Sequence, residues 1–223
     1  EDAGARVWPA GEKLTIIDCL FSNNVVRGAS GYGGGLHMVG FVAPTLLTNC
    51  LFVQNEIKGG DNSTGGGAVY LSVSASGQGP QVYTCTFLEN RSSYFTGGAV
   101  QMATGGGTNA LWRDCVFMNN YASNHGGAVH GVIGGTFESC SFVSNTAHFY
   151  QGGAVRVSGA SATAPIFTNC LFLLNQAGAS GQGGGAVSAE APVTLVDCRV
   201  LQNYSASGGG GLLWSGSGGT IRN

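Results

Sequence analysis

One six-residue pattern occurs seven times in this chain of 223 residues. Each copy begins with a cysteine, has an aromatic or apolar residue two positions later, and ends on an asparagine. The copies are CLFSNN, CLFVQN, CTFLEN, CVFMNN, CSFVSN, CLFLLN and CRVLQN, and they contain every cysteine of the chain. A pattern that returns about every 30 residues is typical of solenoids, in which each repeat stacks on the next.

A second motif alternates with the first and consists of two glycines followed by apolar residues. Its copies are GGLHM from Gly34, GGAVYL from Gly66, GGAVQM from Gly97, GGAVHG from Gly126, GGAVRV from Gly152, GGAVSA from Gly184 and GGLLW from Gly210. Three positions before each cysteine stands an apolar residue, namely Ile16, Leu47, Val82, Trp112, Phe137, Phe167 and Leu195. Each unit thus supplies three short extended segments, and none has the 3.6-residue period of a helix.

Three strands in the same order in every repeat predict an all-β fold. We expect a right-handed parallel β-helix of about seven coils of roughly 30 residues, with three short strands per coil. It would form a single β-helix repeat domain over residues 1–223. The final GGTIRN matches the residues that precede a cysteine in other units, and Gly4 lies 15 residues before Cys19 as Gly35 lies 15 before Cys50. We therefore expect the chain to be cut mid-coil at both ends.

Stacking places equivalent residues of successive coils in ladders about 4.8 Å apart. Cysteine and phenylalanine, two positions apart in a strand, should point together into the core, and asparagine amides should bond to the copies above and below at a left-handed turn. The predicted structural ladders are Cys19, Cys50, Cys85, Cys115, Cys140, Cys170 and Cys198; Phe21, Phe52, Phe87, Phe117, Phe142 and Phe172; and Asn24, Asn55, Asn90, Asn120, Asn145, Asn175 and Asn203. Turn-forming residues precede the cysteines, and glycine pairs allow tight corners.

Composition excludes several classes of partner. Only 9% of the residues are charged and the net charge is −2, so we expect no nucleic-acid partner. The longest apolar runs are too short for a membrane-spanning helix. A surface rich in Gly, Ser, Thr and Asn favours an extracellular or cell-surface protein.

Neither metal nor cofactor is predicted. No C-x-x-C pair occurs, and a cysteine at the same position in every coil suits a small buried hydrophobe. The histidines at positions 37, 125, 130 and 148 lie near the glycine-rich corners, and the position of His130 holds Tyr70, Gln101, Arg156 or Ser188 in other units. This variable position is interpreted as exposed, with no catalytic histidine.

A polysaccharide lyase or glycoside hydrolase is the alternative function, and it would need neighbouring carboxylates as acid and base. Asp18, Asp114 and Asp197 precede cysteines three coils apart, roughly 14 Å, which is too far for glycoside hydrolysis. The longest interval between cysteines carries Glu56, Lys58 and Asp61 and is the remaining place for such a site. The repeat is not broken there, and we predict that the chain is not an enzyme.

Two features of the loops bear on recognition and modification. Aromatic residues in the variable loops either pack their own loop or form a binding face for a sugar or another partner; they are Tyr32, Tyr94, Phe95, Tyr121, Phe149, Tyr150 and Tyr204. N-x-S/T sequons occur at Asn62, Asn90 and Asn203. Because the last two belong to the asparagine ladder, Asn62 is the candidate glycosylation site.

The paired GGA-[ILV] and F-x-x-N motifs resemble the repeats of the chlamydial polymorphic outer membrane proteins. The resemblance covers nearly the whole chain, with six F-x-x-N and five GGAV copies. It implies a β-helical surface adhesin of the autotransporter type. The leading hypothesis is a non-catalytic extracellular structural or adhesive β-helix, either a segment of a larger surface protein or a protomer of a fibre that stacks end to end. Its partners would be neighbouring repeats, its own copies, and host-cell or glycan surfaces.

Overall fold

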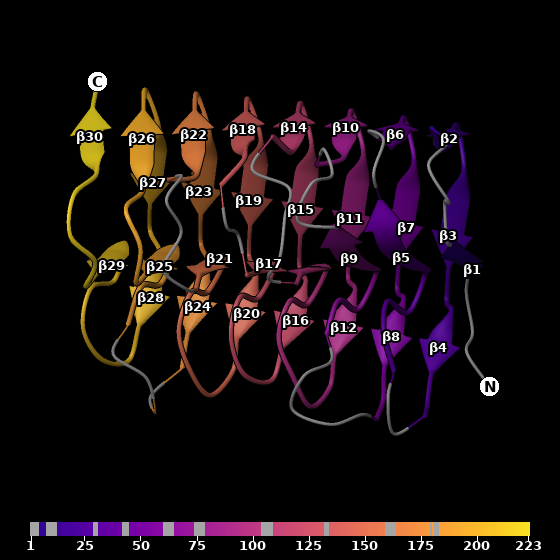
Figure 1. Cartoon of the computed structure of the whole chain (residues 1–223). Helices are drawn as coiled ribbons and strands as arrows, with labels where there is room; N and C mark the ends of the chain where they lie inside the picture. The colour runs from indigo at the N-terminus through magenta and orange to yellow at the C-terminus, as the bar shows by residue number, and fades with distance from the viewer. Residues whose placement is uncertain are drawn as a thin grey trace.

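In the computed structural model the chain forms a β-solenoid in which strands of successive coils lie side by side from one end to the other (Figure 1). The structure describes residues 5–7, 13–28, 31–41, 45–59, 65–73, 79–103, 109–131, 134–158, 164–178, 180 and 183–223. Over these residues every strand pairing is parallel. The first and the last described residues lie at opposite ends of the stack (Figure 1).

The chain visits four parallel sheets in turn. The first sheet holds β1 (Ala5–Val7), β5 (Leu36–Phe41), β9 (Val69–Val73), β13 (Val100–Met102), β17 (Val129–His130), β21 (Val155–Val157), β25 (Val187–Ala189) and β29 (Leu212–Trp214). The second holds β2 (Thr15–Ile17), β6 (Leu46–Thr48), β10 (Gln81–Tyr83), β14 (Leu111–Arg113), β18 (Thr136–Glu138), β22 (Ile166–Thr168), β26 (Thr194–Val196) and β30 (Thr220–Arg222).

The third and fourth sheets follow each cysteine. The third holds β3 (Leu20–Ser22), β7 (Leu51–Val53), β11 (Thr86–Leu88), β15 (Val116–Met118), β19 (Ser141–Val143), β23 (Leu171–Leu173) and β27 (Arg199–Leu201). The fourth holds β4 (Val25–Val26), β8 (Glu56–Ile57), β12 (Arg91–Ser92), β16 (Tyr121–Ala122), β20 (Thr146–Ala147), β24 (Gln176–Ala177) and β28 (Tyr204–Ser205).

The prediction of three strands per coil was wrong, because the fourth sheet was missed. Its strands are two residues long and follow directly after the ladder asparagines. Each interior strand places only one residue inward, such as Ile57 or Ala122, so the sequence shows no alternation there. The strands are held by pairing with neighbouring coils, as Arg91 and Ser92 pair with Tyr121 and Ala122.

The core is built from columns of like side chains. Phe21 and the five phenylalanines in register with it stack with centroid separations of 4.7 to 4.9 Å and nearly parallel rings. Val200 pairs with Phe172 and ends this column. Burial of each interior phenylalanine contributes roughly 1.5–3 kcal/mol to stability. The apolar residues of the second sheet pack opposite, with Trp112 and Phe137 stacked at 5.6 Å.

Two corners of each coil use left-handed backbone at ordinary residues. The residue before each cysteine has a positive φ, between 49° at Thr84 and 56° at Asp18. The second corner differs from our expectation, because the left-handed residue is the one before the ladder asparagine, such as Asn119 before Asn120. The asparagine is therefore selected by its hydrogen bonds, which are described below.

Candidate functional site

The asparagine ladder is a continuous chain of side-chain hydrogen bonds through the molecule. Asn120 is representative: its Nδ2 donates to Phe87 O at 2.9 Å and to Asn145 Oδ1 at 2.9 Å. Its Oδ1 accepts bonds from the backbone N–H and the Nδ2 of Asn90. The same arrangement links Asn24 through to Asn203. The hydrogen-bonding groups of these amides are therefore occupied by contacts within the fold.

The cysteine ladder lies in the core as free thiols. Cys115 Sγ donates to Arg113 O at 3.4 Å and to Val82 O at 3.6 Å, and the other thiols make similar bonds. Burial raises the pKa of Cys85 to about 12. The Cys85 thiol is thus protonated at neutral pH and is no nucleophile.

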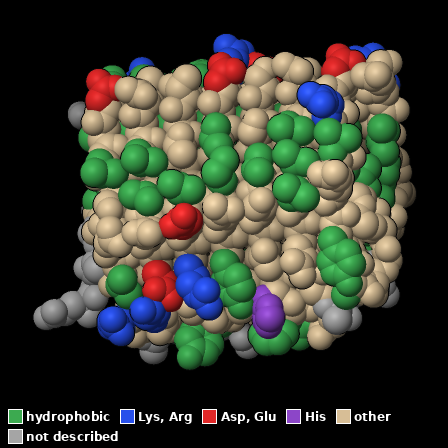
Figure 2. Space-filling view, turned by 180° about the vertical axis from the view of Figure 1, so that it is seen from behind, with side chains coloured by type: hydrophobic (Ala, Val, Ile, Leu, Met, Phe, Trp, Pro, Cys, Tyr) green, Lys and Arg blue, Asp and Glu red, His purple; other side chains and the backbone are tan. Residues whose placement is uncertain are grey.

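Candidate acidic residues are placed in structural contacts. Asp18, Asp114 and Asp197 occupy the left-handed corner of the second sheet, where Asp18 Oδ1 accepts a 2.7 Å bond from Asn49 of the next coil. Glu56 lies 3.1 Å from Lys58 and 3.6 Å from Arg91. Figure 2 shows that charged side chains are few on the face seen from behind, most of them near its upper and lower edges, with apolar side chains in rows between them. Asp61 and the candidate glycosylation site Asn62 lie outside the described residues.

The variable position after GGAV was predicted to be exposed, and this prediction was wrong. In the first sheet His37, Tyr70, Gln101, His130, Arg156 and Ser188 are in register. Gln101 is 8% exposed, Arg156 6% and Ser188 fully buried. The outer face of the first sheet is therefore largely covered and carries a buried polar column.

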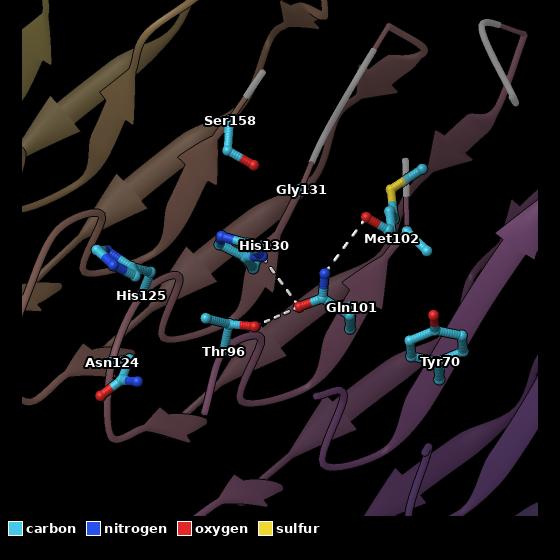
Figure 3. Close-up of a pocket in the computed structure, with 10 residues that line it drawn as sticks. Tyr70, Thr96, Gln101, Met102, Asn124, His125, His130, Gly131 and Ser158 are labelled. Atoms are coloured by element: carbon cyan, nitrogen blue, oxygen red, sulfur yellow. Dashed lines mark hydrogen bonds between the residues drawn. The ribbon is translucent and has the colours of Figure 1, made fainter. Parts of the chain in front are cut away.

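A cavity of about 540 Å³ opens over the middle of this column, and we call it the polar groove. Tyr70, Gln101 and His130 from β9, β13 and β17 lie along it, with His125 at one side and Met102 at the other (Figure 3). The described residues that line it are Tyr70, Thr96, Gln101, Met102, Ala103, Asn124, His125, His130, Gly131 and Ser158. The sequence had singled out His125 and His130, but had not brought them together with Gln101.

Hydrogen bonds fix the side chains of the groove. Gln101 Oε1 accepts bonds from the Thr96 hydroxyl at 2.5 Å and from His130 Nδ1 at 3.0 Å (Figure 3). His125 Nδ1 accepts the backbone N–H of Gln151 at 3.4 Å. These partners set opposite tautomers: in neutral His130 the Nε2 is an acceptor, and in neutral His125 the Nε2 carries the proton. The two rings lie 5.9 Å apart and present one acceptor and one donor.

Both imidazoles are neutral at physiological pH. Burial lowers the pKa of His130 to about 3, assisted by the nearby His125 and Arg156. Burial also lowers the pKa of His125 to about 4, where Arg156 adds to the effect and Glu190 opposes it. Arg156 is itself paired with Glu190 and donates to the Ser188 hydroxyl at 3.0 Å. The groove is therefore polar without being strongly charged.

These depressed pKa values predict acid sensitivity. A neutral histidine in the fold contributes stability that is fully present above about pH 6.5 and is lost as the pH falls toward the folded-state value. Between pH 7.5 and 4.5 the wild-type chain should lose about 2 kcal/mol more unfolding free energy than His130→Gln. Gln is chosen because Gln101 holds the equivalent place one coil earlier. Urea denaturation at both pH values measures this, and equal losses in the two proteins would contradict it.

The aromatic residues of the loops divide between packing and exposure. Tyr32 packs 4.7 Å from Tyr70, and Phe95 is buried. Tyr150 stacks on His125 at 4.9 Å and supports that side of the polar groove. Tyr94 and Tyr204 are largely exposed, at 63% and 58%.

A model of the Chlamydia polymorphic membrane protein repeat matches residues 114–132. This segment is similar to the repeats of that family. It contains Phe117 and Asn120 of the ladders and His125 and His130 of the groove. The match confirms the resemblance drawn from the paired motifs. Comparisons with curated proteins and with solved structures gave no significant match.

Among the residues that the structure describes, no helix has the length and the apolar character needed to span a membrane. No group of three or more His, Cys, Asp or Glu side chains among the same residues has the arrangement of a metal site.

Proposed function

We propose that this chain is a non-catalytic structural or adhesive β-helix displayed outside the cell or at its surface. The observation that carries the proposal is the continuity of the ladders, since the phenylalanine contacts recur from Phe21 to Phe172 and the asparagine contacts from Asn24 to Asn203. A protein built this way is stiff, because every coil is fixed by both neighbours. A stiff solenoid of this kind can hold a binding surface away from the cell to which it is attached.

The surface location is supported by the repeat match to the Chlamydia polymorphic membrane protein family. It is also supported by the low charge and the many small polar residues. Aromatic side chains such as Tyr94 and Phe149 are exposed and offer contact points for a partner. Host-cell or glycan surfaces are the partners that an adhesive role implies.

End-to-end stacking is part of the same proposal. The outer strands of each sheet, such as β30, have backbone groups that another coil can pair with, and Ile221 on that strand is 60% exposed. A neighbouring repeat or a second copy of this chain would pair with these backbone groups and cover Ile221. We also infer that the coils are right-handed, because crossover connections between parallel strands are nearly always right-handed. We infer about seven coils, because the cysteine motif occurs seven times.

The adhesive role is tested with beads. Beads coated with the folded chain should adhere to epithelial cells, whereas beads coated with the heat-unfolded chain should not. An antibody against the folded chain should label intact cells of the source organism as strongly as permeabilised cells. Absence of both adhesion and surface labelling would overturn the proposal.

The enzymatic alternative is tested separately. The chain is incubated with polygalacturonate, xylan, chitin and cellulose, and both reducing ends and unsaturated uronates are measured. We expect no product above a blank without protein. Product that disappears in Glu56→Gln would instead establish a carbohydrate-active enzyme, with Lys58 and Arg91 as the neighbouring cations.

A further inference from the structure

We propose that the polar groove over Gln101 and His130 binds a neutral oligosaccharide. The inference deepens the proposed surface role and rests on it for the presence of the ligand outside the cell. It concerns binding alone, and no bond of the ligand is broken.

The shape of the groove is that of a ligand site. Its volume of about 540 Å³ lies in the range of roughly 300–1,000 Å³ common for small-molecule pockets. Its floor is formed by regular strands whose backbones are fixed on both sides. Gln101 on that floor is only 8% exposed, and its amide is held by Thr96 and His130. The polar groups are therefore preorganised.

The hydrogen-bonding groups match hydroxyls. Neutral His130 offers an acceptor at Nε2, and neutral His125 offers a donor at Nε2. A sugar hydroxyl both donates and accepts, so one hydroxyl or a pair on adjacent carbons can satisfy both rings. Asn124 and Ser158 also line the groove, and their side chains can both donate and accept hydrogen bonds.

The charge of the groove favours a neutral ligand. The described lining residues include no carboxylate and no lysine or arginine. The guanidinium of Arg156, which follows His130 in the column, is paired with Glu190 and Ser188. A sulfated or uronate-rich chain would find no cation to replace its lost hydration.

An aromatic ring completes the match to a sugar. The Tyr70 ring lies at the end of the groove away from His125 (Figure 3), whereas the Met102 side chain belongs to the core. A pyranose has C–H faces as well as hydroxyl edges, and a C–H face packs on such a ring. A peptide ligand would instead need a deep apolar pocket for an anchoring side chain.

The test uses purified wild-type chain at pH 7.5 and isothermal titration with neutral hexasaccharides of glucose, xylose, mannose and N-acetylglucosamine. Hyaluronan and heparin oligosaccharides serve as anionic probes, and a random peptide library serves as the peptide probe. We expect at least one neutral oligosaccharide to bind with a Kd below about 1 mM. No neutral binding up to about 10 mM, or binding of anionic or peptide probes alone, would overturn the inference.

Variants locate the site. His130→Ser removes the acceptor, and the chain already tolerates serine at the equivalent Ser188; His130→Tyr places a larger ring in the groove, as Tyr70 does in its own coil. Each should weaken binding about tenfold or more. His148→Ser is the matched control, because His148 does not line the groove, and it should bind as wild type. Circular dichroism verifies the fold of each, and equal binding by folded His130→Ser and His130→Tyr would contradict the inference.

The two proposals fail differently. If the beads adhere to cells but no oligosaccharide binds, the groove inference fails and the surface role stands. If an oligosaccharide binds in the groove and is cleaved, the site stands and the non-catalytic role fails.

Discussion

Gly127→Ala is expected to lower the free energy of unfolding by about 4 kcal/mol or more. The added Cβ would lie 2.1 Å from Gly153 O and 2.5 Å from the backbone N and C of Thr146. These atoms belong to the next coil, and hydrogen bonds such as Gly127 N–H to Gly152 O at 3.1 Å fix its position. The coils cannot separate locally without breaking the pairing of the first and fourth sheets. Urea denaturation followed by circular dichroism measures the effect.

Gly28→Ala is the matched control for the same change of residue. A Cβ at Gly28 would have no neighbour within 4 Å. Its φ is outside the left-handed range, so alanine is expected to leave stability unchanged or to raise it slightly. Equal stability of Gly127→Ala and Gly28→Ala would show that the close approach of the coils at Gly127 is wrong.

The second large effect is expected for Asn120→Ala, at about 3–5 kcal/mol of lost stability. The substitution leaves Phe87 O, the Asn90 backbone N–H and the Asn90 amide without their partner. Asn90 and Asn120 are both essentially inaccessible to water. Each buried polar group left unsatisfied costs about 1–3 kcal/mol.

Asn203→Ala tests whether burial sets this cost. Asn203 accepts the same two bonds from Asn175 and donates to Phe172 O, but it is only partly buried. Water can replace part of what is lost, so we expect a cost of about 1–2 kcal/mol. If the two substitutions have equal effects on the denaturation midpoint, the ladder is not stabilised by burial of its amides.

The ladders illustrate how much of the fold the repeats predicted. Spacing alone indicated parallel strands stacked in register, because only stacking gives every coil the same apolar and asparagine positions. The glycine pair was predicted only as a corner. In the structure its two members differ, since Gly126 has a φ of 63° whereas Gly127 is required by the approach of the next coil.

The polar groove could not be predicted in the same way. The sequence showed that Tyr70, Gln101, His130 and Arg156 share a position, but their variety was interpreted as exposure. Corner residues a few positions away in the sequence, such as Thr96 and His125, line the groove together with Gln101 and His130, and so do residues of neighbouring coils such as Ser158. The tautomers of the two histidines depend on Gln101 and on the backbone of Gln151, each in another coil.

The sequence by itself determined the solenoid class and its core columns. When the same residue type recurs in every coil, its neighbours in the column are its own copies, so the repeat alone predicts the contact. Tertiary structure decided the fourth sheet, the residues that take left-handed backbone and the burial of the variable column. These depend on unlike residues meeting across coils. Such contacts leave no periodic trace in the chain.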